Sequence, residues 1–192
     1  MFLGLCALVI VAMVPLTGGR LSRLGQVQWR WIPLAVAALA LQVVVITVWP
    51  TMPHALAVAG HLTSYLMLGA VVWANRAVPG MLVIAAGAGA NALTIAINGG
   101  TLPASTWALR HAGIKSRAGF DNSGTVSHPH LAWLGDTMVT PSWLPLRNMV
   151  SIGDLVLLAG AIVLVARVSR TAPDEDAPLH VWNPQALTFA LG

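Results

Sequence analysis

The most constraining feature of this sequence is a long stretch, residues 31–75, that contains no Lys, Arg, Asp or Glu. Over the whole chain of 192 residues, 57% are hydrophobic and only 8% are charged, whereas about 25% of an ordinary soluble domain is charged. So few charges cannot cover a water-facing surface. A transmembrane helix needs about 20 mostly apolar residues, and the sequence supplies several such runs. We therefore predict an all-α, polytopic membrane helix bundle.

Turn-forming residues divide the apolar sequence into segments of spanning length. Pro50 and Pro53 split the uncharged stretch into two helices joined by a tight turn, because proline interrupts a helix. Gly18-Gly19 and Gly99-Gly100 end two further runs. About five transmembrane helices are predicted in this way, at residues 2–18, 32–49, 55–74, 80–98 and 149–166.

The distribution of arginines predicts the orientation of the bundle. Outside the long loop 99–148, every arginine falls on one side of the predicted helices: Arg20, Arg23, Arg30, Arg76, Arg167 and Arg170. The positive-inside rule makes that side cytoplasmic, and the four cations of the long loop count little against it. The N-terminus and the loop 99–148 are therefore expected outside.

The expected domains follow from this orientation. The first apolar run precedes the first charge, Arg20, so it is expected to be a retained helix rather than a signal peptide. We predict a transmembrane domain at residues 1–170, a cytoplasmic tail at residues 171–192, and a location in the plasma membrane.

Polar side chains in helices two to five are confined to the predicted outer halves. The inner halves contain no hydrogen-bonding side chain except Trp73. Because polar groups are costly in hydrocarbon, their depth is informative; several lie roughly 8–10 Å below the outer ends at the helical rise. The candidate ligand-binding residues are Gln42, His61, Tyr65, Asn91, Asn98 and Asp154.

Two hypotheses account for this polar layer. The first is hydrogen bonding between helices, with Gly87 and Gly89 allowing close approach. The second is an outward-facing polar cavity roofed by the loop 99–148, which binds a small ligand, a lipid head group or a proton. The second hypothesis makes His61 and Asp154 the ionisable members of the cavity.

Asp154 has three possible roles. Ser151 and Asp154 have the spacing of a capping box at the start of the fifth helix. Alternatively, Asp154 pairs with His61 or Arg147, or it handles a proton. Capping is the interpretation that the pattern favours.

The sequence contains no strong catalytic, metal or cofactor motif. His128-Pro129-His130, with His111, Asp121 and Asp136, invites a metal interpretation, but a lone His-x-His without further ligands at fixed spacing is typical of a surface loop. Nucleotide-binding loops, nucleophile elbows and His-Glu-x-x-His helices are absent from the sequence. We predict no catalytic residue, no metal, no cofactor and no nucleic-acid partner, and expect that the protein is not an enzyme.

Three short motifs resemble a known family. They are Asn98-Gly99-Gly100-Thr101-Leu102-Pro103, Leu134-Gly135-Asp136 and Ser151-Ile152-Gly153-Asp154. The sequence is similar in them to a family of small multi-pass membrane proteins of Gram-positive bacteria that has only a domain-of-unknown-function label. The resemblance implies a plasma-membrane location and gives no activity. It also implies that the Asn-Gly-Gly and Gly-Asp positions act together.

Two functions are compatible with these observations. The first is a non-catalytic accessory subunit or scaffold that packs against a larger membrane complex and contacts lipid. The alternative is an outward-facing protein that binds or transports a small ligand or lipid through the polar layer. A membrane enzyme using His61, Tyr65 and Asp154 is disfavoured because the sequence supplies no nucleophile or metal with convincing spacing.

Overall fold

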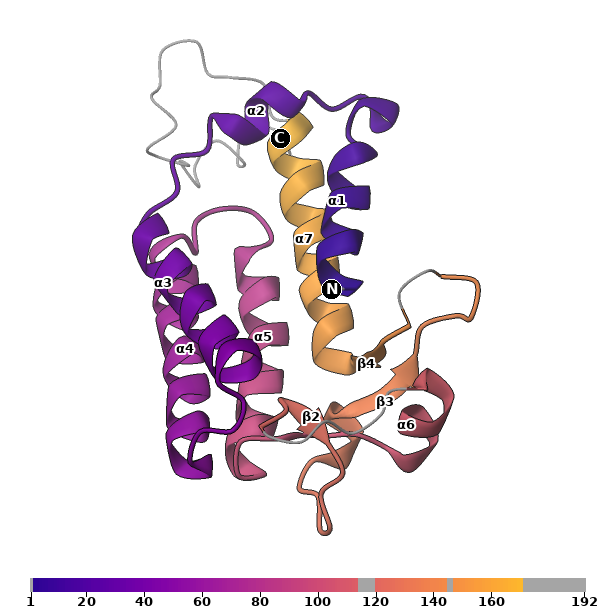
Figure 1. Ribbon diagram of the computed structural model, residues 1–192. Coiled ribbons are helices and arrows are strands. Elements are labelled where there is room, and N and C mark those ends of the chain that lie inside the picture. The colour runs from indigo at the N-terminus through magenta and orange to yellow at the C-terminus, as the bar shows by residue number, and fades with distance from the viewer. Residues whose placement is uncertain (1, 114–119, 145–146, 171–192) are drawn as a thin grey trace.

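The computed structural model describes residues 2–113, 120–144 and 147–170, and these are mostly helical (Figure 1). The described residues form seven α-helices and four short strands. The five predicted spanning segments correspond to α1 (Phe2–Ala12), α3 (Ile32–Val43), α4 (His54–Ala74), α5 (Met81–Ile97) and α7 (Ile152–Arg170). The predicted tail at residues 171–192 lies outside the described residues.

Two of these helices, α4 and α7, are long and apolar enough to cross a membrane. Helix α3 continues into a π-helical turn (Val44–Val48), and this combined run and α5 are apolar but shorter. Helix α1 is shorter still, with 11 residues. The separation of α3 from α4 at Pro50 and Pro53 agrees with the prediction, because α4 begins at His54 directly after the second proline.

The predicted boundaries of the first and fifth helices were wrong, for local reasons. The first ends at Ala12, and a 3-10 turn (Pro15–Thr17) follows it, because proline cannot continue the α-helical hydrogen-bond pattern. The fifth begins at Ile152 rather than at residue 149, because the preceding residues form strand β4 (Met149–Ser151) and pair with β3 (Asp136–Val139).

Glycines allow α5 and α7 to pack backbone against backbone in antiparallel orientation. A Cβ atom added at Gly87 would lie 2.6 Å from the backbone nitrogen of Leu157. One added at Gly160 would lie 2.6 Å from the backbone nitrogen of Ile84. Nothing lies within 4 Å of such an atom at Gly89. The prediction of close approach is therefore confirmed for Gly87 and was wrong for Gly89.

The segment 99–148 folds against one end of the helices, which we call the strand end (Figure 1). It contains β1 (Leu102–Pro103), α6 (Thr106–Ala112), β2 (Ser123–Gly124), a 3-10 turn (Ala132–Leu134) and β3. Strands β1 and β2 pair in parallel, and β3 and β4 pair antiparallel with a register shift between Asp136 and Met138. The longest helix among its described residues is α6, with seven residues, and these residues cover the bundle as the hypothesis of a roofing loop requires.

Asparagines at the ends of two helices fasten the peripheral chain. Asn98, at the end of α5, donates to the carbonyl of His130 and accepts from its backbone N–H, both at 2.8 Å. Asn75, at the end of α4, makes the same pair of bonds with the backbone of Arg30, both at 2.9 Å. One pair of hydrogen bonds lies at each end of the bundle. Asn98 and Asn75, which end α5 and α4, therefore also position the chain around His130 and Arg30.

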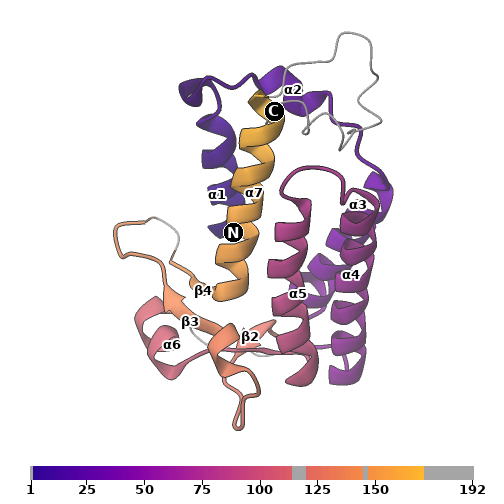
Figure 2. The same cartoon turned by 180° about the vertical axis from the view of Figure 1, so that it is seen from behind.

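The end opposite the strands we call the arginine end. The short helix α2 (Leu21–Gly25) lies there beside the last turn of α7 (Figure 2). The backbone N–H of Arg20 and the guanidinium of Arg23 both donate to the carbonyl of Ser169, at 2.9 and 3.2 Å. Cations at a helix C-terminus complement its partial negative charge. This contact fixes α2 across the end of α7.

Candidate functional site

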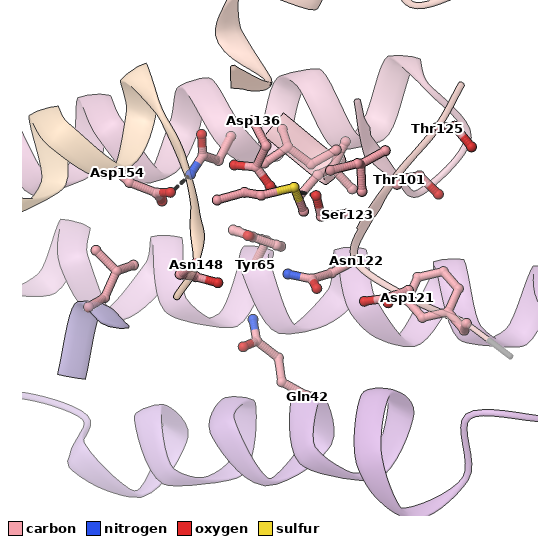
Figure 3. A pocket seen from close by; sticks show the side chains of 18 of the residues that line it. Gln42, Tyr65, Thr101, Asp121, Asn122, Ser123, Thr125, Asp136, Asn148 and Asp154 are labelled. Carbon is pink, nitrogen blue, oxygen red and sulfur yellow. Dashed lines mark hydrogen bonds between the residues drawn. The ribbon is translucent and has the colours of Figure 1, made fainter. Parts of the chain in front are cut away.

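A cavity of about 1170 Å³ lies at the strand end, between the helices and the segment 99–148 (Figure 3). Its lining is built from two sources. The helices supply Gln42 from α3, Tyr65 from α4, Asn91 from α5 and Asp154 from α7. His54, at the start of α4, also lines the cavity, and the remaining polar side chains come from the segment 99–148: Thr101, Asp121, Asn122, Ser123, Thr125, Asp136 and Asn148.

Three carboxylates line this cavity, and they are the only acidic residues in the described part of the chain. Asp121 precedes β2, Asp136 begins β3 and Asp154 lies in the first turn of α7. The described residues that line the cavity include no Lys or Arg. The cavity is therefore acidic in a chain whose formal net charge is +4.

Asp154 is held by a capping box and by α5. Its backbone N–H donates to Ser151 Oγ at 3.0 Å, and its carboxylate accepts from the Ser151 N–H at 3.1 Å. The Asn91 amide donates to the other carboxylate oxygen at 2.9 Å and accepts from Ser151 Oγ at 3.0 Å. The capping prediction is confirmed, and the expected interhelical hydrogen bonding joins α5 to α7 at this point.

Asp136 is the most deeply buried of the three acids, with 6% of its surface exposed. Ser123 Oγ donates to its carboxylate at 2.5 Å, which links β2 to β3. Burial raises the pKa of Asp136 to about 6, since a carboxylate loses its hydration there. The Ser123 hydrogen bond opposes this shift, and the negative charge of Asp154 adds to it.

His61 lies behind the cavity and not in its lining. Its side chain is 1% exposed, and neither ring nitrogen has a hydrogen-bond partner among the described residues. The ring packs edge to face against Tyr65 and Phe120, with centroid distances of 5.2 and 5.6 Å. Both of those aromatic rings line the cavity. The hypothesis that Asp154 pairs with His61 was wrong, because Asp154 is bound by Asn91 and Ser151 instead.

The structure brings together four of the six candidate residues. Gln42, Tyr65, Asn91 and Asp154 line one cavity (Figure 3), whereas His61 supports its aromatic rings and Asn98 fastens the segment 99–148 at His130. Sequence reasoning expected that segment to roof a cavity but did not assign its lining residues: Phe120, Asp121, Asn122, Ser123, Asp136 and Asn148. One sequence signal pointed to these residues, namely that acids are so rare in this chain.

In the part of the chain that the structure describes, no three His, Cys, Asp or Glu side chains group closely enough to hold a metal ion.

Comparison with known proteins identifies a family. No curated protein and no solved structure matches the sequence significantly. A family model described as a family of unknown function, DUF5317, matches residues 26–166. The match includes α3, α4, α5, the strand end and most of α7. It therefore contains every described residue that lines the cavity except Leu3 of α1. The resemblance to a domain-of-unknown-function family is thus confirmed, and the chain belongs to the DUF5317 family.

Proposed function

We propose that this is a plasma-membrane protein with five transmembrane helices that binds a small molecule in the cavity at its outer end. The observation that carries the proposal is the cavity itself. Polar side chains from four helices, α3, α4, α5 and α7, converge there with side chains from the segment 99–148 that covers them. Ligand sites are typically concave, occur between helices of bundles and carry a few convergent polar groups.

Exposed apolar surface supports the membrane location. Leu66 on α4 is 75% exposed, Leu82 on α5 is 61% exposed and Val36 on α3 is 60% exposed. Burying such side chains in lipid removes apolar surface from water, which is favourable. The helices α3 with its π-helical turn and α5 each have 17 residues, at the lower limit of about 17 that spans a bilayer.

The separation of charge along the bundle supports the proposed orientation. The helix ends that carry the arginines lie opposite the strands (Figures 1 and 2). With the arginine end in the cytoplasm, the cavity opens to the outside. Binding is favoured over transport, because the inner halves of helices two to five supply no polar side chains to complete a path.

Cysteine labelling tests the orientation. In a Cys6→Ser background, which removes the one native thiol, Ser142→Cys and Ser22→Cys place a cysteine at exposed positions of the strand end and the arginine end. A membrane-impermeant maleimide should label Ser142→Cys in intact cells and Ser22→Cys only after lysis. The reverse pattern would overturn the orientation.

A cavity-filling variant tests ligand binding. Gly124 lines the cavity, and a Cβ atom added there would meet only Thr101 at an ordinary 3.8 Å. Gly124→Leu should therefore fold and occupy the ligand space. Gly69→Leu is the matched control, because Gly69 on α4 is exposed and has nothing within 4 Å of an added Cβ.

The readout is the melting temperature of the detergent-solubilised protein with a panel of cationic, anionic and neutral small molecules. At least one class should raise the melting temperature of the parent and of Gly69→Leu but not of Gly124→Leu, because only a ligand of the folded state stabilises it. If no compound stabilises the parent, or if Gly124→Leu responds like the parent, the binding proposal fails.

The accessory-subunit hypothesis concerns the lipid-facing surface and stays a prediction. The same exposed side chains, such as Leu66 and Leu82, would fit neighbouring helices as well as lipid. Affinity purification after gentle solubilisation tests it. Stoichiometric protein partners would support a subunit role, and a solitary protein would contradict it.

A further inference from the structure

We propose that the ligand of this cavity is a small organic cation, which the carboxylates of Asp121, Asp136 and Asp154 attract and the rings of Tyr65 and Phe120 contact. This inference rests on the proposed binding function and adds the chemical class of the ligand. Three independent features of the cavity support it: its three carboxylates, its aromatic wall and its size.

The described lining of the cavity contains three carboxylates and no Lys or Arg. Among the described residues, the hydrogen bonds to Asp136 and Asp154 come from neutral donors: the Ser123 hydroxyl, the Asn91 amide and the Ser151 backbone. The one basic side chain in this described lining, His54, packs edge to face against Phe120. Carboxylates removed from water are stabilised by a nearby positive charge. A cationic ligand would supply the positive charge that no described Lys or Arg brings to the cavity.

The aromatic wall is suited to the same ligand. Cations are attracted to the faces of aromatic rings, because the ring quadrupole makes each face partially negative. Tyr65 and Phe120 line the cavity, and the buried ring of His61 packs against both of them. His61 thereby holds the two rings in place. The backbone N–H of Phe120 donates to the carbonyl of Pro50 at 2.7 Å, which fixes this wall to the turn between α3 and α4.

The amides and the volume favour an amine over a bare metal ion. The side-chain amides of Gln42, Asn122 and Asn148 line the cavity, and an amide oxygen can accept a hydrogen bond from an ammonium group. A metal ion needs a compact ligand set, and the described His, Cys, Asp and Glu side chains form none. The volume of about 1170 Å³ is far larger than a single ion requires, and sites for organic ligands range over about 300–1,000 Å³.

The test uses spermidine and choline as cationic probes, with succinate, glucose and Ca²⁺ as probes of other classes. Binding to the detergent-solubilised full chain is measured by calorimetry at pH 7.5. At least one organic cation should bind, and the other three probes should not. Asp121→Asn and Asp136→Asn keep the shape of each side chain and should each weaken cation binding about tenfold, because each removes one attracting charge.

A variant that adds a negative charge excludes misfolding as the cause of a change in binding, because a misfolded protein would not bind the cation more tightly. Gln42→Glu adds a carboxylate of nearly the same shape to the cavity wall and should strengthen cation binding severalfold. Equal affinity of the parent, Asp136→Asn and Gln42→Glu for the cation would overturn the inference. If glucose or succinate binds and Gly124→Leu abolishes that binding, the binding function stands and the cation inference fails. If no probe binds and no compound of the melting-temperature panel stabilises the parent, the binding function and the cation inference both fail.

Discussion

Replacing Gly153 with alanine is expected to lower the free energy of unfolding by about 2–4 kcal/mol, one of the largest effects of any single methyl group in this protein. A Cβ atom at Gly153 would overlap the side-chain oxygen of Asn91 and lie 2.8 Å from the backbone oxygen of Gly87. Overpacking of a tight contact costs about 1–3 kcal/mol. The displaced amide would also lose its hydrogen bonds to Ser151 and Asp154, each typically worth ~0.6 kcal/mol in a membrane.

The neighbouring helix offers both a second test and a control. Gly87→Ala should be nearly as harmful, because its Cβ would meet the backbone of Gly153 and Leu157 at 2.5 and 2.6 Å. Gly89→Ala lies two residues further along α5 and has open space around the added atom, so it should leave stability unchanged within about 0.5 kcal/mol.

Unfolding in a denaturing detergent, followed by tryptophan fluorescence, measures these differences. A clear separation of Gly87→Ala and Gly153→Ala from Gly89→Ala supports the antiparallel packing of α5 on α7. Equal stability of the three variants would contradict that packing. The cavity is affected too, because Asn91 and Asp154 are cavity residues whose positions depend on the Gly153 contact.

The helices were predictable because their signals are local. Proline at positions 50 and 53 ends and starts helices for reasons of backbone chemistry, and the Ser151–Asp154 spacing forms the expected capping box. Helix ends that depend on a distant partner were not predictable. Ile152 starts α7 only because Met149–Ser151 pair with a strand that is ten or more residues away.

The same distinction explains the candidate site. Depth along a helix is readable from sequence, so Gln42, His61, Asn91 and Asp154 were placed in one layer, and all of them except His61 line one cavity. Gly87 and Gly89 look equivalent in sequence, and only the position of α7 decides which one is a contact. Asp136 joins the site through the pairing of short strands, whose residues carry no periodic pattern long enough to predict.

Replacing Asp136 with asparagine is expected to make the protein more stable at pH 7.5, by about 2–3 kcal/mol. The pKa of Asp136 is raised from 3.8 in the unfolded chain to about 6 in the folded protein, so the folded state prefers the neutral acid. One pKa unit corresponds to about 1.4 kcal/mol. Asparagine is neutral at every pH and can still accept the hydrogen bond from Ser123, so it removes the cost of burying a charge.

The direction of the pKa shift of Asp136 determines how the stability difference between parent and Asp136→Asn depends on pH. A raised pKa stabilises the parent fully below pH 3.8, and this contribution is lost as the pH rises through about 6. Parent and Asp136→Asn should therefore have similar stability near pH 4 and diverge up to about pH 7. The charged and titratable groups that share the cavity are Asp121, Asp154, Tyr65 and His54, and they are unchanged between the two proteins.

Two further variants separate the charge from the shape of the side chain. Ser123→Ala removes the hydrogen bond that lowers the pKa of Asp136, so it should destabilise the protein more at pH 7.5 than at pH 4. Asp121→Asn makes the same charge change at a partly exposed position of the cavity and should change stability less than Asp136→Asn. Melting temperatures at the two pH values measure all four proteins.

If Asp136→Asn is more stable than the parent and binds the cation more weakly, the charge of Asp136 serves binding and lowers the stability of the fold. A saturating organic cation should then narrow the gap between the parent and Asp136→Asn at pH 7.5, because it binds the charged cavity more tightly and stabilises the parent by mass action. If Asp136→Asn is instead less stable than the parent at both pH values, its carboxylate serves the pairing of β2 and β3, and the charge of the cavity has another purpose.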